Sequence, residues 1–200
     1  EGRAVLLYHV ERMNEESANA LLKVMEEPPE GVLFLLTADS LASVLPTIRS
    51  RCVSFAVAPV SPADCTRYCA AQGVDKKTAA LYSELFDGHI GTVLAVARDE
   101  ARAAQVEKAL ELARAAAARD SYTAAVLLAA YEKDKAAAAA LLTDFRAVAA
   151  AGLRSSPRAP VQGTQARQAV RLADAALQRL GAQVNPKVVL SVFAAKLRTV

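Results

Sequence analysis

The first sixty residues alternate between apolar runs and helical periodicity. Continuous apolar runs at residues 4–8 and 31–37 predict buried strands, and an alternating run at residues 52–57 predicts a third strand. Between the first two runs, apolar residues recur at i, i+3, i+4 and i+7, which predicts one buried stripe of a helix. The residues of this stripe are Ala18, Leu21, Leu22 and Met25. The order strand, helix, strand, turn, strand is typical of a parallel α/β sheet.

The predicted helix has clear signals at both ends. Asn14 stands where an N-cap is needed, and Pro28-Pro29 ends the helical pattern because proline has no amide to donate. Three strands make only part of an α/β sheet, and the chain enters the first of them almost at once. We therefore expect a fragment of a larger fold that lacks the front half of its sheet.

Strand patterns stop after residue 60. Ser61-Pro62-Ala63-Asp64 combines a cap, a first-turn proline and an acid, which is a strong helix start. Asp75 caps a second predicted helix, and Gly88 and Gly91 lead into a third. These signals predict a small helical unit over residues 61–99.

The remainder of the chain is rich in alanine, which favours helices and close helix packing. The clearest loop is Arg154–Pro160. The fold class is therefore mainly α with a partial α/β N-terminal portion. The helices predicted after residue 99 span residues 100–119, 121–132, 135–153, 164–181 and 186–199.

Composition places the chain among soluble proteins, with 54% apolar and 22% charged residues. We find no apolar run long enough to span a bilayer and no secretory leader, so a cytoplasmic location is expected, with no membrane partner. Residues 144–200 carry 9 Lys/Arg against 2 Asp/Glu. This basic region fits an anionic partner or a solvated helix face, and the lack of interleaved aromatic residues favours the solvated face.

Three cysteines do not form a disulfide framework. Cys65 and Cys69 share one helix face, with Cys52 upstream. A metal site would need a fourth ligand, for which the chain offers only His9 and His89. Small buried thiols are the simpler interpretation.

Two segments carry a resemblance to a known family. Asn19–Pro29 reads NALLKVMEEPP, and Leu45–Cys52 reads LPTIRSRC. The first resembles the "ANALLKxLEEPP" helix of bacterial clamp-loader subunits of DNA polymerase III, which are AAA+ proteins, and the second resembles their Ser-Arg-Cys segment. Together the similar residues span about 3–60.

The resemblance implies a role for Arg51. In this family the arginine of Ser-Arg-Cys projects into the nucleotide site of the next subunit as an arginine finger. A guanidinium suits this role because its planar donors can meet phosphate oxygens as charge builds. Arg49, Ser50 and Cys52 are implied as supports of the same interface. The alternative is an ordinary pair between Arg51 and a surface acid.

The chain also departs from the ATP-hydrolysing members. No G-x-x-x-x-G-K-[ST] motif occurs, and Tyr8-His9-Val10-Glu11 stands where those members carry an Asp-Glu pair for magnesium. Gly91 replaces their lid arginine. The pattern resembles delta-prime subunits rather than gamma or tau, so we expect no bound cofactor, no bound metal and no intrinsic enzyme activity. His9 could serve as a general base but is more simply structural.

The resemblance implies a domain order and a set of partners. It implies the C-terminal part of an AAA+ domain over residues 1–60, a helical lid over 61–99 and an oligomerisation collar over 100–200. The partners implied are delta, gamma or tau and, through the complex, the sliding clamp and primer–template DNA. Arg167 and Arg171 are not expected to contact DNA. Two alternatives stay open: an ATPase subunit with its P-loop before residue 1, and a helical scaffold without a trans-acting role.

Overall fold

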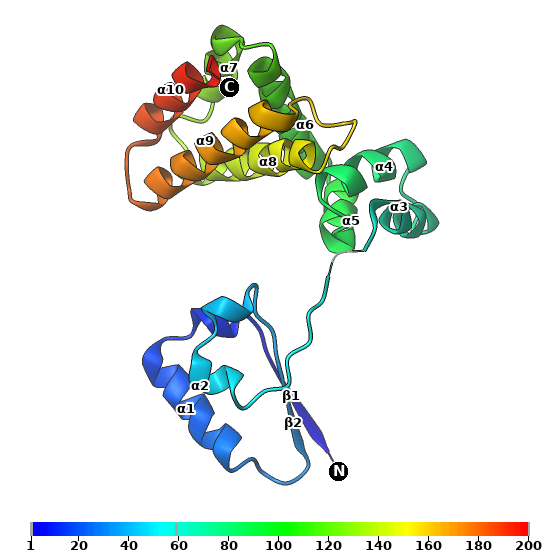
Figure 1. Ribbon diagram of the computed structural model, residues 1–200, viewed down its shortest axis with the longest axis vertical. Helices are drawn as coiled ribbons and strands as arrows, with labels where there is room; N and C mark the ends of the chain where they lie inside the picture. The colour runs from blue at the N-terminus through cyan, green and yellow to red at the C-terminus, as the bar shows by residue number, and fades with distance from the viewer. Residues whose placement is uncertain (1, 59, 200) are drawn as a thin grey trace. The chain divides into compact units, whose positions relative to one another are not determined.

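The computed structural model describes residues 2–58 and 60–199 and consists of two compact units, Glu1–Val57 and Ala58–Val200. The first contains a small parallel sheet and the second is all helical (Figure 1). The protein is thus mainly helical with a short two-stranded N-terminal sheet. Each unit has its own hydrophobic core.

The first unit is a βαβ crossover followed by short helical turns. Strands β1 (Arg3–Leu7) and β2 (Val32–Leu36) pair in parallel from Arg3↔Val32 to Leu7↔Leu36. They correspond to the first two of the three predicted strands. Helix α1 (Glu15–Glu26) connects them, and Figure 1 shows α1 and α2 on one side of the strands. The short elements are η1 (Val10–Arg12), η2 (Leu41–Ser43) and α2 (Pro46–Arg49).

The predicted signals of α1 are confirmed. The Asn14 side chain accepts a hydrogen bond from the Ser17 amide (2.8 Å), which satisfies one free amide of the first turn. Ala18 and Leu21 are buried, and Leu22 and Met25 pack beside them. This apolar stripe forms the core of the unit with three residues from the turns, Val10, Val44 and Ile48.

The predicted third strand at residues 52–57 is wrong. The segment has no regular structure, and Val53, Phe55 and Val57 are 82%, 85% and 94% exposed. Alternation predicts a half-buried strand, but a strand forms only where another offers free backbone groups beside it. No described strand pairs with this segment, so the sheet has two strands instead of three.

The second unit contains eight helices among the described residues, and their order matches the sequence prediction. Three predicted helix ends, 119, 132 and 199, lie two or three residues beyond the observed ends, because helix ends fray into turns. Helices α3 to α10 span Pro62–Ala71, Lys76–Leu85, Ile90–Arg98, Glu100–Ala117, Ser121–Ala129, Lys135–Leu153, Gly163–Gly181 and Pro186–Leu197.

Polar caps set most of these helix starts. Side chains of Ser61 and Asp75 accept hydrogen bonds from first-turn amides, as their sequence positions predicted, and Asn185 caps α10 in the same way. Three further caps, Asp99, Asp120 and Asp134, do the same. One continuous core runs from Cys65 to Leu197 through all eight helices.

Helix α8 is long and apolar enough to cross a membrane by length and composition, with a mean hydropathy of 1.4. This differs from the sequence analysis, which found no apolar run of that length. Half of that window is buried inside the protein, and α8 packs against both α6 and α9. It also carries the buried Asp144, which pairs with Arg102 of α6. These contacts are those of a core helix in a helical bundle.

Gly152 gives a test of packing between α8 and the loop that follows it. A Cβ atom there would lie 1.9 Å from the Val161 carbonyl oxygen. Backbone must therefore shift, and we expect Gly152→Ala to lower the free energy of unfolding by about 1–3 kcal/mol or more. At Gly91 an added Cβ meets nothing within 4 Å, so Gly91→Ala should be neutral or stabilising by up to about 1 kcal/mol.

Urea unfolding followed by circular dichroism measures both glycine variants against the parent chain. Equal midpoints for Gly152→Ala and Gly91→Ala would contradict this packing.

Candidate functional site

Arg51 lies at the end of a tightly anchored turn. Pro46 occupies the first helical position of α2, where its fixed φ suits the helix. Ile48 is 1% exposed and fixes α2 against the core of the first unit. The Arg51 amide donates to the Ile48 carbonyl (3.1 Å), so the backbone of Arg51 is held by the buried residue three positions earlier.

The guanidinium of Arg51 is held by two acceptors. One nitrogen donates to the Thr47 carbonyl (3.0 Å), and another donates to Glu26 Oε1 at the end of α1 (2.5 Å). The side chains of Arg51 and Glu26 are 37% and 52% exposed. Ion pairs this open to water contribute little to stability, so Arg51 can exchange Glu26 for a stronger anion at small cost.

The other three predicted site residues surround Arg51 in different ways. Ser50 donates its hydroxyl to the Thr47 carbonyl (3.0 Å) and so supports the turn. Cys52 is partly buried against the core of the first unit. Arg49 is exposed and makes no ion pair within the described residues. The structure thus brings Ser50, Arg51 and Cys52 into one anchored turn, with Arg49 free on its surface.

Glu26 is the residue of this site that sequence reasoning missed. It lies inside the quoted Asn19–Pro29 segment, 25 positions before Arg51. Two neighbouring acids, Glu26 and Glu27, stand at the helix end, and spacing alone does not tell which one faces Arg51. Only the packing of α2 beside α1 selects Glu26.

The segment Tyr8–Glu11, where the resemblance led us to look for an acidic pair, does not present two free carboxylates. Tyr8 is 69% exposed, and His9 adopts the left-handed conformation with φ +56°. Burial disfavours the charge of Glu11, but hydrogen bonds from its own backbone and from His9 outweigh it and lower the pKa of that carboxyl. Glu11 is therefore a charged group already engaged by His9.

Gly88 lies just before α5 in the second unit, and Gly91 lies in the first turn of that helix. Gly88 has φ +72°, and a Cβ there would lie 1.7 Å from the Val60 carbonyl oxygen, so this position requires glycine. Gly91 has no such restriction. Steric crowding therefore does not explain why the chain has glycine and not arginine at position 91.

The cysteines behave as buried thiols. Cys65 and Cys69 are fully buried in α3 with their sulfurs 4.0 Å apart. Burial and the neighbouring Cys65 raise the pKa of Cys69 to about 11. Among the described residues, neither cysteine belongs to a group of three potential metal ligands.

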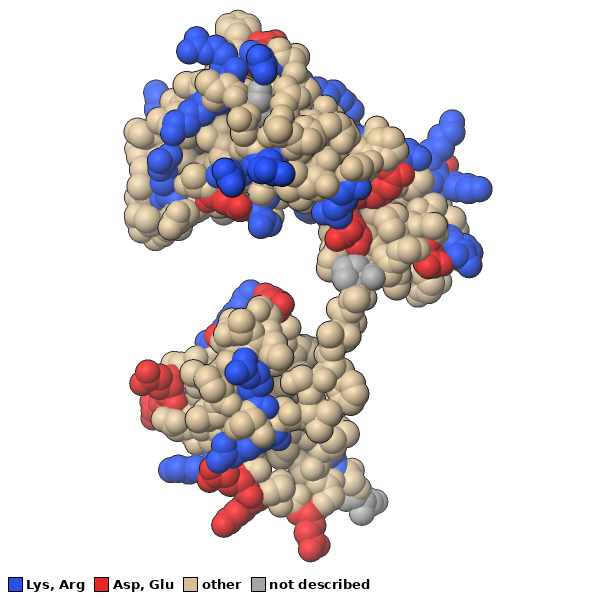
Figure 2. Space-filling view, viewed as in Figure 1, with Lys and Arg blue, Asp and Glu red and all other residues tan. Residues whose placement is uncertain are grey.

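No single basic patch covers the helical unit on the face drawn in Figure 2. On the face drawn in Figure 2, Lys and Arg side chains are scattered over the helical unit, with acidic side chains between them in places. Several of these cations are paired, which favours a solvated, ion-paired surface. The pairs are Arg146–Asp174, Arg154–Asp87, Arg158–Glu84 and Lys187–Glu132.

Comparisons with known proteins find similarity to clamp-loader subunits over the N-terminal part of the chain. The family described as DNA polymerase III, delta subunit, matches residues 1–61. DNA polymerase III subunit delta' of Yersinia pestis is 44% identical over 66 residues, which is 33% of this chain and 19% of that protein. The same subunit of Haemophilus influenzae is 54% identical over 50 residues, 25% of this chain and 15% of that protein. The expected clamp-loader resemblance is confirmed for this part of the chain.

The matched stretches are thus a small share of each curated relative. For the fold, a crystal structure of a DNA polymerase III gamma subunit-related protein from Thermotoga maritima superposes with a TM-score of 0.55. The match covers 98% of this chain and 72% of that one at 22% identity. The similarity of fold therefore extends through both units.

Proposed function

We propose that the chain is part of a delta-prime-type clamp-loader subunit of DNA polymerase III that acts on a neighbouring subunit through Arg51. The observation that carries the proposal is the exposed guanidinium of Arg51, fixed by an anchored backbone inside the Ser-Arg-Cys segment. A rigid turn with an exposed cationic tip suits contact with a phosphate outside the chain. Supplied in trans, such an arginine is worth about 10³–10⁵ in rate in related systems.

The pair with Glu26 is compatible with this role. It is also the contact that an ordinary surface arginine makes. Because the pair is exposed, a bound triphosphate with several negative charges competes well against one carboxylate. Glu26 then keeps the guanidinium near its working position while no neighbour is bound.

Non-hydrolysing character is part of the proposal. The 200 residues contain no P-loop sequence, and Tyr8 and His9 stand in place of the metal-binding acids. Arg51 would therefore act on ATP held by the neighbour, with no nucleotide bound by this chain. The rival within the family is an ATPase subunit whose P-loop precedes residue 1, and a full-length sequence with that motif would decide for it.

The domain roles follow from the same proposal. Residues 1–60 are the C-terminal part of an AAA+ domain, residues 61–99 a lid and residues 100–200 an oligomerisation collar. Delta and the gamma or tau subunits are the direct partners, and the clamp and primer–template DNA are reached through the complex in the cytoplasm. The exposed apolar residues Tyr122, Val126, Val188 and Val192 of the helical unit offer contact area for such a collar.

Reconstitution tests the proposal against a scaffold without a trans-acting role. The chain is mixed with delta and the ATPase subunits of its own complex, and assembly is followed by size-exclusion chromatography with light scattering. We expect one copy per complex and DNA- and clamp-stimulated ATP hydrolysis that requires the chain. No hydrolysis is expected from the chain alone. Failure to assemble, or the same hydrolysis without the chain, would refute the proposal.

A further inference from the structure

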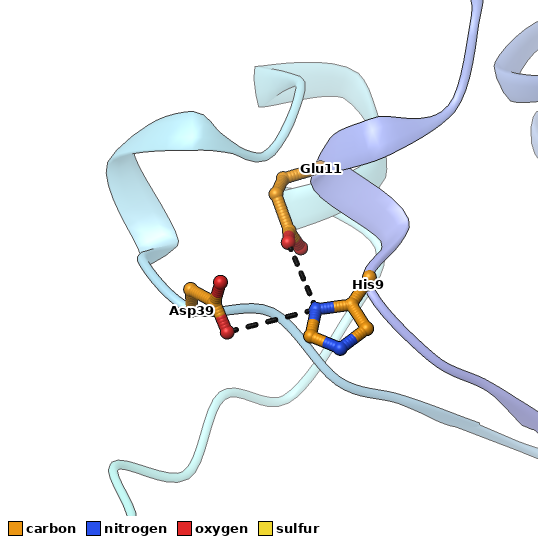
Figure 3. A group of neighbouring side chains, drawn as sticks. All are labelled: His9, Glu11 and Asp39. Carbon is orange, nitrogen blue, oxygen red and sulfur yellow. Dashed lines mark hydrogen bonds and ion pairs between the residues drawn. The ribbon is translucent and has the colours of Figure 1, made fainter. Parts of the chain in front are cut away.

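Three potential ligands meet where the two strands end. The ligand atoms of His9, Glu11 and Asp39 all lie within 4.8 Å of one another, and Figure 3 shows the two carboxylates facing the His9 ring. His9 and Glu11 follow β1, and Asp39 follows β2. Because the strands are parallel and paired up to Leu7↔Leu36, their carboxyl ends deliver these side chains to the same edge.

The backbone at this edge is held in an uncommon conformation. His9 has φ +56°, which few residues other than glycine adopt. Thr37 stabilises it, since its hydroxyl accepts from the His9 amide (3.2 Å) and its carbonyl accepts from the Val10 amide (3.0 Å). The left-handed turn reverses the chain so that Glu11 faces back toward the ring of His9.

The spacing fits a small cation. Nδ1 of His9 lies 3.2 Å from Glu11 Oε1 and 3.6 Å from Asp39 Oδ1. Zinc-to-ligand bonds of about 2.0–2.2 Å in a tetrahedral site separate two ligands by about 3.3–3.6 Å. A cation can therefore contact all three groups with only small movements of their side chains.

A second observation at Glu11 points to a missing partner. The Glu11 side chain is 10% exposed, and its Oε2 atom is buried with no hydrogen bond, while Oε1 contacts His9. Leaving a buried carboxylate oxygen without a partner is costly. A cation that binds both oxygens of the Glu11 carboxylate would supply the partner that Oε2 lacks.

We propose that His9, Glu11 and Asp39 bind one divalent transition-metal ion of the zinc type, independently of any nucleotide. One imidazole with two carboxylates suits zinc, whereas magnesium prefers oxygen ligands alone and keeps its waters. The remaining coordination position is left to water. The ion ties the end of β1 to the loop after β2.

Arg12 is the competitor for this site. Its guanidinium lies 3.7 Å from Glu11 Oε1 and 3.9 Å from Asp39 Oδ2, and its side chain is 70% exposed. These contacts are long and open to solvent, so Arg12 can swing away when the cation binds. We expect Arg12→Ala to tighten metal binding.

The test is titration of the whole chain with Zn²⁺ and separately with Mg²⁺, by calorimetry and by imidazole NMR. The chain has two histidines, so the signals of His9 can be compared with those of His89. We expect saturable one-to-one binding of Zn²⁺ that shifts His9 alone, and no comparable binding of Mg²⁺. Co²⁺ should bind without thiolate charge-transfer absorption, which excludes the cysteines.

Matched variants complete the test. Loss of even an outer partner of a metal ligand costs about 10–100-fold in affinity, so His9→Ala should weaken Zn²⁺ binding by at least that factor. His89→Ala should bind like the parent chain. If His9→Ala fails to fold by circular dichroism, Asp39→Asn on its exposed loop takes its place. Equal Zn²⁺ affinity in the parent and these ligand variants, or no binding by the parent, would overturn the site and leave only ion pairs between His9 and the two acids.

Discussion

Arg51→Ala is expected to lower ATP hydrolysis at the neighbouring nucleotide site by about 10³–10⁵ in kcat. The exposed guanidinium can place two donors on phosphate oxygens where charge builds in the transition state. Because that interaction is strongest in the transition state, kcat should fall far more than the affinity for ATP. Sites that do not face this chain keep their own rate.

Two matched variants separate chemistry from assembly. Arg51→Lys keeps the charge but loses the planar fork, so it should restore only a small part of the rate. Arg67→Ala removes an exposed cation of α3, outside this site, and should leave kcat at that site within a few-fold of the parent. The measurement is steady-state phosphate release from complexes of verified composition. A full rate with Arg51→Lys would show that a point charge is enough.

The second large effect is expected on stability, at the Arg102–Asp144 pair between α6 and α8. Asp144 is 3% exposed, and both its oxygens accept from the Arg102 guanidinium. Hydrogen bonding to Asp144 raises the pKa of Arg102. Arg102→Ala leaves a buried carboxylate without a partner, which should cost about 3–5 kcal/mol of unfolding free energy.

The reverse substitution should cost less. Asp144→Ala leaves Arg102, whose side chain is 32% exposed and can reach water. Arg114→Ala is the control, because its pair with Glu107 is exposed on both sides and should contribute less than about 1 kcal/mol. Urea unfolding of the three variants measures their losses of unfolding free energy and so ranks them. Equal losses for Arg102→Ala and Arg114→Ala would contradict a structural role for the buried pair.

Most of the fold could be predicted from local signals in the sequence. Caps such as Asn14, Ser61 and Asp75 act on amides two or three residues away, so the sequence reveals them directly. The same holds for the apolar stripe of α1. The third strand at residues 52–57 could not be judged this way, because pairing depends on a neighbouring strand and not on the alternation of its own residues.

At the candidate site, the sequence predicted the motif that contains Arg51 but not the contacts that its side chain makes. Arg51 stood in a recognisable segment, but its partner Glu26 depends on how α2 packs beside α1. Asp39 is 28 residues after Glu11, and the parallel register of β1 and β2 brings them together. The spacing of residues along the sequence does not reveal contacts between side chains that lie this far apart in the chain.

A single-turnover experiment tests the central claim most directly. Complexes assembled with the parent chain or with Arg51→Ala are loaded with ATP, triggered with clamp and primed DNA, and followed by rapid phosphate release. The account predicts unchanged ATP loading and loss of the fast phase from the one site that faces Arg51. An unchanged rate and amplitude in the Arg51→Ala complex would contradict it.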